Sequence, residues 1–249
     1  MNGVLRLASA GDLHCTKDAQ GTLAPLFAEM AAAADVIALC GDLTDYGLPD
    51  EAHVLAGELR GVHADVVAVL GNHDFESGHA AEVSDILREA GVRVLDGDAA
   101  EIGGVGFAGT KGFAGGFGPS ALGPWGEGAI KAFVQEAVDE AMKLESALAR
   151  LRTEQKVVVL HYAPIAGTVV GEPEQIYAFL GSSRLEDPID RLGATAVVHG
   201  HAHHGSLEGA TRGGIPVYNV SIPLLRRTGG TTFRVLELSA DPVASEQIM

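Results

Sequence analysis

The sequence predicts an α/β fold in which two packed β-sheets carry helices on their outer faces. Two observations support this prediction. Apolar runs of strand length alternate with segments of helical periodicity through the first half of the chain. In the C-terminal third, short strand-like runs are separated by glycine pairs, as in antiparallel sheets. A chain of 249 residues with 47% apolar residues can form one core, so we expect a single domain over residues 1–249.

The first half reads as a βαβ series, which implies a parallel sheet with right-handed crossovers. The expected strands are residues 4–10, 36–40 and 66–70, with shorter strands at 92–95 and 101–108. The expected helices are residues 23–34, 51–60 and 80–90. Asp50 follows Pro49 and is expected to cap the second of these helices.

The second half contains two loops and a long helix. Residues 103–128 are dense in glycine and predict a long loop, which in compact domains is usually functional or mobile. Apolar residues then recur at helical spacing from Ile130 to Leu151. A second loop is expected over residues 163–188. The expected strands here are residues 157–160, 194–198, 206–209, 217–220 and 231–238, with turns at Gly213-Gly214 and Gly229-Gly230.

Residues of the kinds that bind metals directly follow five of the expected strands. They are Asp12 and His14, then Asp42, then Asn72 with His73 and Asp74, then His161, and finally His201 and His203. Side chains at the carboxyl ends of successive strands build the sites of α/β sheets. Each residue alone would more simply be a turn residue or a buried imidazole. The whole set, in this order, predicts a metal site.

These motifs together resemble those of the calcineurin-like metallophosphoesterases. The resemblance rests on Asp12-Leu13-His14, Gly41-Asp42, Gly71-Asn72-His73-Asp74, His161 and Gly200-His201-Ala202-His203, and it covers most of the chain. It implies a four-layer αββα sandwich, in which two mixed β-sheets are flanked by helices. It also implies a dinuclear metal centre.

The resemblance further implies how two metals would share their ligands. One metal would be held by Asp12, His14 and His203, the other by Asn72, His161 and His201, and Asp42 would bridge them. Imidazole and carboxylate ligands suit several first-row ions. The expected cofactors are therefore two divalent or trivalent ions, with manganese, iron and zinc foremost.

His73 is expected to be catalytic, because the corresponding histidine of the family faces substrate as a general acid or phosphate stabiliser. Asp74 is the expected partner that fixes the tautomer of His73 and raises its pKa. Asp45 matches another recurrent acidic position, which would support the ligands. At least one of His199 and His204 is expected to form a supporting hydrogen bond.

The expected reaction is attack of a metal-bridging hydroxide on phosphorus, without a phosphoenzyme. A phosphodiester is favoured over a phosphomonoester, because the stretch from Cys40 to Pro49 resembles bacterial class III cyclic-nucleotide phosphodiesterases. The loop over residues 103–128 departs from their pattern, so cyclic-nucleotide specificity stays open. The alternatives are a small-molecule phosphomonoesterase and, more remotely, a non-catalytic interaction scaffold on the same fold.

Charge and cysteine content limit the partners. A net charge of −16 opposes binding to long nucleic acids, whose affinity comes largely from lysine and arginine. The expected partner is a small phosphoester, with no membrane association, and a homodimer stays open. The first strand begins too early for a signal peptide, and two cysteines suit a reducing compartment, so we expect a cytoplasmic protein.

Three residues of the loops offer contacts to a substrate. Lys111 supplies a cation, Trp125 a stacking surface and Arg184 a phosphate-binding fork. For each residue alone, the simpler interpretation is a solvated lysine, a packed tryptophan or a surface arginine. Their roles, and that of the loop over residues 103–128, stay open at this point.

Overall fold

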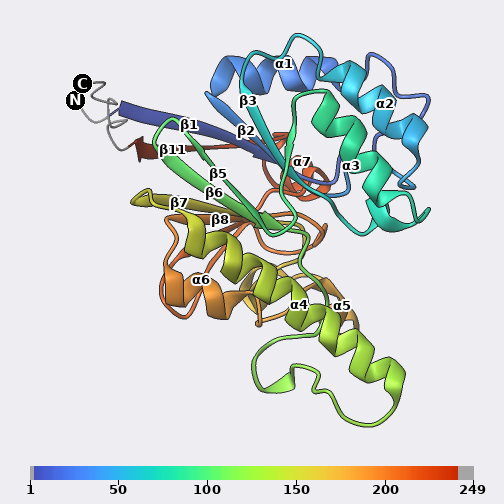
Figure 1. The fold of residues 1–249 in the computed structure, drawn as a ribbon, viewed down its shortest axis with the longest axis vertical. Coiled ribbons are helices and arrows are strands. Elements are labelled where there is room, and N and C mark those ends of the chain that lie inside the picture. The colour runs from blue at the N-terminus through green and yellow to red at the C-terminus, as the bar shows by residue number, and fades with distance from the viewer. Residues whose placement is uncertain (1–2, 241–249) are drawn as a thin grey trace.

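Two mixed β-sheets lie face to face in the computed structural model, which describes residues 3–240 (Figure 1). Within this range one sheet has five strands and the other has six. Helices cover the outer face of each sheet, so the molecule has four layers, as predicted. Of the helices in this range, none has both the length and the apolar character needed to cross a bilayer.

The first sheet has the order β11-β1-β2-β3-β4. Its strands are β1 (Gly3–Ala10), β2 (Val36–Cys40), β3 (Asp65–Val69), β4 (Arg93–Val94) and β11 (Arg234–Ala240). Strands β1 to β4 are parallel, which confirms the predicted βαβ series, and β11 runs antiparallel to β1.

The second sheet has the order β5-β6-β7-β8-β10-β9. Its strands are β5 (Asp98–Ile102), β6 (Val105–Thr110), β7 (Gln155–Leu160), β8 (Ala196–His199), β9 (Glu208–Ala210) and β10 (Pro216–Asn219). The four central strands are parallel and the two edge strands are antiparallel to their neighbours.

The helices fill the outer layers and the strand connections. Those packed on the first sheet are α1 (Ala24–Ala33), α2 (Pro49–Glu58) and α3 (Ala80–Glu89), and those on the second are α4 (Gly128–Arg150) and α6 (Glu186–Leu192). The short helices α5 (Tyr177–Leu180) and α7 (Ile222–Gly229) lie in connections.

The core is formed by alternate residues of strands that are buried on both faces. In β2, Val36 and Ala38 pack between the two sheets, whereas Ile37 and Leu39 pack against helices α1 to α3. The side-chain period of two in a strand produces this division. The central parallel strands are therefore largely apolar, and the polar residues of the motifs lie where these strands end.

Two local expectations in the first half were wrong. Residues 101–108 do not form one strand, because Gly103 and Gly104 take positive φ angles of 57° and 83° and turn the chain into the β5–β6 hairpin. The second helix begins at Pro49 after the N-cap Leu48, so Asp50 does not cap it. Instead the Glu51 carboxylate accepts hydrogen bonds from the N–H groups of Leu48 and Tyr46.

The C-terminal third also differs from the prediction. Gly229 and Gly230 end helix α7 and do not connect two paired strands, since β10 lies in the second sheet and β11 in the first. Strand β10 pairs in parallel with β8, so only its pairing with β9 is antiparallel. A glycine pair after a short helix gives the same local signal as a turn between strands, which explains the difference.

Candidate metal centre

The polar residues predicted from the sequence meet at the carboxyl ends of the strands of both sheets. The first group consists of Asp12, His14 and His203, whose ligand atoms lie within 4.8 Å of one another. Asp12 Oδ1 is 2.8 Å from His203 Nε2, and both carboxylate oxygens of Asp12 accept the N–H of His201 at 3.1 and 3.0 Å. Residues 189 positions apart are thereby joined.

The second group consists of Asp42, His161 and His201, again with ligand atoms within 4.8 Å of one another. The amide oxygen of Asn72 joins it, because Asn72 Oδ1 is 2.9 Å from His161 Nε2. The other ring nitrogen of His161, Nδ1, lies 2.9 Å from the carbonyl oxygen of Cys40, which orients the imidazole toward Asn72. This pattern leaves Nε2 as the atom of His161 that faces the group.

Asp42 lies between the two groups. Its Oδ1 is 3.3 Å from His161 Nε2 and its Oδ2 is 3.9 Å from His14 Nε2. One oxygen therefore faces each group, which is the arrangement that a shared ligand needs. Oδ1 also accepts the backbone N–H of His73 at 2.9 Å, so the carboxylate is held in this orientation.

The backbone at the centre is in an unfavourable conformation. In residues 3–240 the non-glycine residues with positive φ are Asp12, His14, Asp42 and His201. A left-handed conformation costs a non-glycine residue on the order of 1–3 kcal/mol, and such residues cluster at functional sites. All four were singled out as candidate ligands from the sequence, so the strain is confined to the donor groups.

Burial sets the protonation of the imidazoles. It lowers the pKa of His161, and together with the neighbouring His161 ring it lowers the pKa of His201 to about 4. Both rings are therefore neutral at neutral pH and have lone pairs for a metal. The hydrogen bond to Asp12 instead raises the pKa of His203.

The two carboxylates also influence each other. Burial and the nearby charge of Asp12 raise the pKa of Asp42. Burial alone would raise the pKa of Asp12 too, but its hydrogen bond to His203 and the neighbouring imidazoles lower it to about 2. Within residues 3–240 no lysine or arginine forms an ion pair with either carboxylate. Two buried carboxylates with no lysine or arginine partner suit the binding of cations.

The donor groups thus fit metals by their chemistry. Neutral imidazoles, carboxylates and an amide oxygen suit first-row divalent ions better than calcium or magnesium, which prefer oxygen ligands. Asp12, His14 and His203 could hold one ion, and Asn72, His161 and His201 a second, with Asp42 facing both. The ligand assignment that the resemblance implied stays a prediction.

Gly71 allows the close approach of two of the motif loops. A Cβ atom at Gly71 would lie 2.2 Å from both the backbone nitrogen and Oδ1 of Asp42. Real Cβ atoms essentially never come this close, and the backbone nitrogen cannot move aside cheaply. A glycine is therefore required here for Asp42 to lie against the loop that carries Asn72.

Gly71→Ala should consequently displace Asp42. We expect it to lower metal content and to cost about 1–3 kcal/mol of unfolding free energy, as overpacking usually does. Gly57→Ala is the matched control, since Gly57 lies near the end of α2 with no heavy atom within 4 Å of an added Cβ. The control should be neutral or stabilising by about 0.5–1 kcal/mol. Equal metal content in the two variants, measured by plasma emission, would contradict the close-approach argument.

His73 lies beside the two donor groups and forms a third group of possible ligands with His14 and Asp45, whose ligand atoms lie within 4.8 Å of one another. Its Nδ1 is 2.7 Å from the carbonyl oxygen of Asp45, and its ring meets that of His14 edge-on with centroids 4.6 Å apart. Burial lowers the pKa of His73, but the Asp45 carbonyl and the charges of Asp42 and Glu76 outweigh it and raise the pKa. The Asp45 side chain lies 3.2 Å from His14 Nδ1, which is the supporting position expected of it.

Asp74 does not contact the ring of His73, and this expectation is wrong. Its fully buried carboxylate accepts the N–H groups of Gly71, Leu43 and Thr44 and the hydroxyl of Thr44. Asp74 therefore ties the two motif loops together. The partner of His73 Nδ1 is the Asp45 carbonyl, which sequence could not reveal because the contact depends on where the loop after Asp42 folds.

Several supporting residues lie behind the donor groups. His199 is buried, with Nε2 2.8 Å from the Thr168 hydroxyl and Nδ1 2.8 Å from the Gly200 carbonyl, so it supports the loop that carries His201. His204 instead lies 2.7 Å from a guanidinium nitrogen of Arg227. Both cysteines are buried free thiols, and burial raises the pKa of each, which argues against a thiolate nucleophile.

Sequence reasoning did not identify Glu140. It lies on the apolar face of α4, and its buried carboxylate accepts the Thr110 hydroxyl and the Gly112 N–H. This fixes the turn at Lys111, whose carbonyl accepts the N–H groups of His161 and Tyr162 at 3.1 Å. The signal that could have found it is an acidic residue within a stripe of apolar residues.

The three loop residues have different environments. The Lys111 ammonium is buried, donates to the Gly112 carbonyl at 2.8 Å and lies near three aromatic rings. Arg184 donates to the Leu122 carbonyl at 2.7 Å and so holds the glycine-rich loop. Trp125 is 70% exposed. None of the three forms a hydrogen bond to the donor groups within residues 3–240.

Comparison with known proteins agrees with this architecture. The family model for calcineurin-like phosphoesterases matches residues 5–205. The structure of phosphopantetheinyl hydrolase from Mycobacterium tuberculosis is similar, with a TM-score of 0.68 and 16% identity over 95% of this chain and 96% of that one. The protein TT1561 of Thermus thermophilus matches with a TM-score of 0.53 and 16% identity over 95% of this chain and 99% of that one. Among curated proteins none matches significantly.

Proposed function

The chain belongs to the calcineurin-like phosphoesterase family and is a hydrolase, and we propose that it cleaves small phosphodiesters with the help of two metal ions. The observation that carries the proposal is the position of Asp42 between two donor groups. A carboxylate with one oxygen toward each group suits two cations roughly 3.5–4 Å apart. Manganese, iron and zinc are the ions that the ligand chemistry favours.

The bound metals would supply Lewis acidity and an activated water, which are the usual contributions of such ions to phosphoryl transfer. The chain supplies the rest. Each of the metal donors Asp12, Asp42 and Asn72 is hydrogen-bonded to a neighbouring loop. These bonds fix the positions of the three side chains. His73 faces the same region with Nδ1 engaged by the Asp45 carbonyl, so Nε2 is the atom able to carry a proton to the leaving oxygen.

The charges around the centre favour a diester over a monoester. A monoester carries up to two negative charges and benefits from a cation beyond the metals. In residues 3–240 the nearby cations already have partners, because Lys111 donates to the Gly112 carbonyl and lies 3.9 Å from Glu136, and Arg227 donates to the His203 carbonyl. A diester carries one negative charge, which two metals and His73 can balance. A phosphomonoesterase is the alternative that the assay must exclude.

Removal and return of metal tests this proposal. Chelation should abolish hydrolysis, and titration with manganese, iron or zinc should restore it with saturation at two ions per chain. The substrates should be bis-p-nitrophenyl phosphate and p-nitrophenyl phosphate, followed by natural mono- and diesters. The screen should include a phosphopantetheine ester, because one structural neighbour is a phosphopantetheinyl hydrolase.

We expect kcat/KM to be higher for diesters than for monoesters with the same leaving group. Saturation at one ion per chain would contradict the dinuclear centre. Preference for monoesters would replace the diester proposal with the phosphomonoesterase. Full activity in the chelated protein, verified by elemental analysis, would contradict metal dependence altogether.

A further inference from the structure

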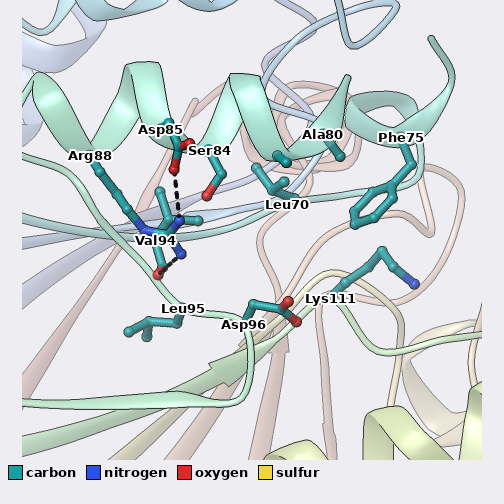
Figure 2. Close-up of a pocket in the computed structure, with 11 residues that line it drawn as sticks. Leu70, Phe75, Ala80, Ser84, Asp85, Arg88, Val94, Leu95, Asp96 and Lys111 are labelled. Carbon is teal, nitrogen blue, oxygen red and sulfur yellow. Dashed lines mark hydrogen bonds and ion pairs between the residues drawn. The ribbon is translucent and has the colours of Figure 1, made fainter. Parts of the chain in front are cut away.

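Two adjoining cavities lie near the candidate metal centre. The smaller, of about 170 Å³, is lined by Asn72, Phe75, Lys111, Phe113, Glu136 and Tyr162. The larger, of about 280 Å³, lies between α3 and the segment that links β4 to β5 (Figure 2). Phe75 and Lys111 line both, so the cavities adjoin at these two side chains.

The smaller cavity borders the donor groups directly. Asn72 contributes both to its wall and to the group with His161. Tyr162, another lining residue, packs its ring against those of His201 and His161, with centroids 4.4 and 5.4 Å apart. A phosphoryl group held by the donors would therefore have this cavity beside it.

Phe75 and Lys111 form a constriction between the cavities. The Lys111 ammonium lies 5.3 Å from the centroid of the Phe75 ring, and Figure 2 shows the two side chains facing each other across one end of the larger cavity. Phe75 is 46% exposed and belongs to none of the four hydrophobic clusters of the described residues, so its ring has room to turn aside. The constriction is thus made of side chains and not of backbone.

The larger cavity has an apolar inner wall, and the charged side chains of Asp85, Arg88, Asp96 and Lys111 also line it. Leu70, Val94 and Leu95 supply its inner wall, and Ser84 points into it from α3 (Figure 2). Arg88 closes the end opposite Lys111, where its guanidinium makes long contacts of 3.4 Å to Asp85 and 3.3 Å to the Val94 carbonyl.

We propose that the two cavities together bind the alcohol portion of the substrate, which is an extended, flexible and largely apolar chain. This inference rests on the proposed phosphoesterase function and specifies its substrate class. Small-molecule sites usually measure about 300–1,000 Å³. Each cavity alone falls below that range, so a compact alcohol would use only the smaller one, whereas an extended alcohol would pass Phe75 and occupy both.

A length series of substrates tests this proposal. Methyl alkyl phosphodiesters with ethyl, butyl, hexyl and octyl groups share similar primary alkoxide leaving groups and differ only in length. With the metal-loaded enzyme, kcat/KM should rise with length by up to about fourfold per methylene, the equivalent of 0.8 kcal/mol per buried CH₂. The rise should stop when the larger cavity is full.

Ser84→Leu fills the larger cavity without touching the donor groups. Ser84 is 6% exposed and points into the cavity, so a leucine there should remove the gain with length and leave the ethyl ester unchanged. Ser146→Leu is the matched control on the exposed side of α4, and it should keep the gain. Ala80→Leu, which lines the same cavity near Phe75, is a second variant in case Ser84→Leu does not fold.

A flat length dependence in the wild type would overturn the inference while leaving the phosphoesterase function intact. Retention of the gain in Ser84→Leu and Ala80→Leu would also overturn it. Alkylphosphonates of the same lengths cannot be hydrolysed and separate this failure from that of the proposed function. Length-dependent binding of these phosphonates without hydrolysis of any ester would support the cavity and contradict the hydrolase, whereas length-independent binding would contradict the cavity.

Discussion

Asp42→Asn should release both metals and lower kcat/KM by more than about 100-fold. Loss of a residue that only orients a ligand costs about 10–100-fold in affinity or activity. Asp42 faces both donor groups, because its carboxylate oxygens lie 3.3 Å from His161 Nε2 and 3.9 Å from His14 Nε2. The fall in kcat/KM in Asp42→Asn should therefore exceed that range. Asparagine keeps the size of the side chain and an acceptor for the His73 N–H, which limits the effect on folding.

The control for this variant is Asp139→Asn, the same change at an exposed position of α4. Metal content should be measured by plasma emission and folding by circular dichroism. Retention of two ions per chain in Asp42→Asn would contradict the bridging role. Loss of one ion with the other retained would assign Asp42 to a single metal.

His73→Ala should impair the hydrolysis of substrates with poor leaving groups far more than that of nitrophenyl esters. An alkoxide of high pKa leaves slowly unless it is protonated, whereas nitrophenolate leaves without help. General-acid assistance is worth about 10²–10⁴-fold, so the loss on alkyl esters should fall in that range. Metal content should stay near wild type, because His73 Nδ1 is engaged by the Asp45 carbonyl and His73 belongs to neither of the two groups assigned to the metals, although it forms a third group with His14 and Asp45.

His79→Ala is the control for this experiment. His79 is an exposed histidine on the same segment, and its ring contacts only Ser77 among the hydrogen bonds of the described residues. An equal loss on alkyl and nitrophenyl esters in His73→Ala would mean that His73 stabilises the phosphoryl oxygens and does not protonate the leaving group. A large loss of metal would instead place His73 among the ligands.

The strand framework and the donor residues could be predicted because they depend on local patterns. Strand β2 was predicted with its observed bounds, since an apolar run of five residues between polar segments has few other interpretations. The candidate ligands that follow five of the strands lie close together because parallel strands end at the same edge of a sheet. The resemblance to a family then supplied the pairing of ligands that spacing alone does not determine.

Other features depend on contacts between distant segments and left no local signal. Asp74 resembles any residue of a short turn, and its role appears only when Leu43 and Thr44 fold against it. The cavities depend on how α3 packs over the segment that follows β4 and on where Lys111, which follows β6, is placed. The β5–β6 hairpin was missed although its glycine pair was visible, because the residues on both sides could equally continue one strand.

The four left-handed residues of the centre also set a limit on how far this protein can be stabilised by design. Glycine adopts positive φ without steric cost, so glycine at Asp12, His14, Asp42 or His201 would relieve strain in the metal-free fold. Each replacement would also delete a donor from the centre. A procedure that ranks substitutions by folding energy alone would therefore select inactive proteins first, and thermostable variants should be sought among positions away from these loops.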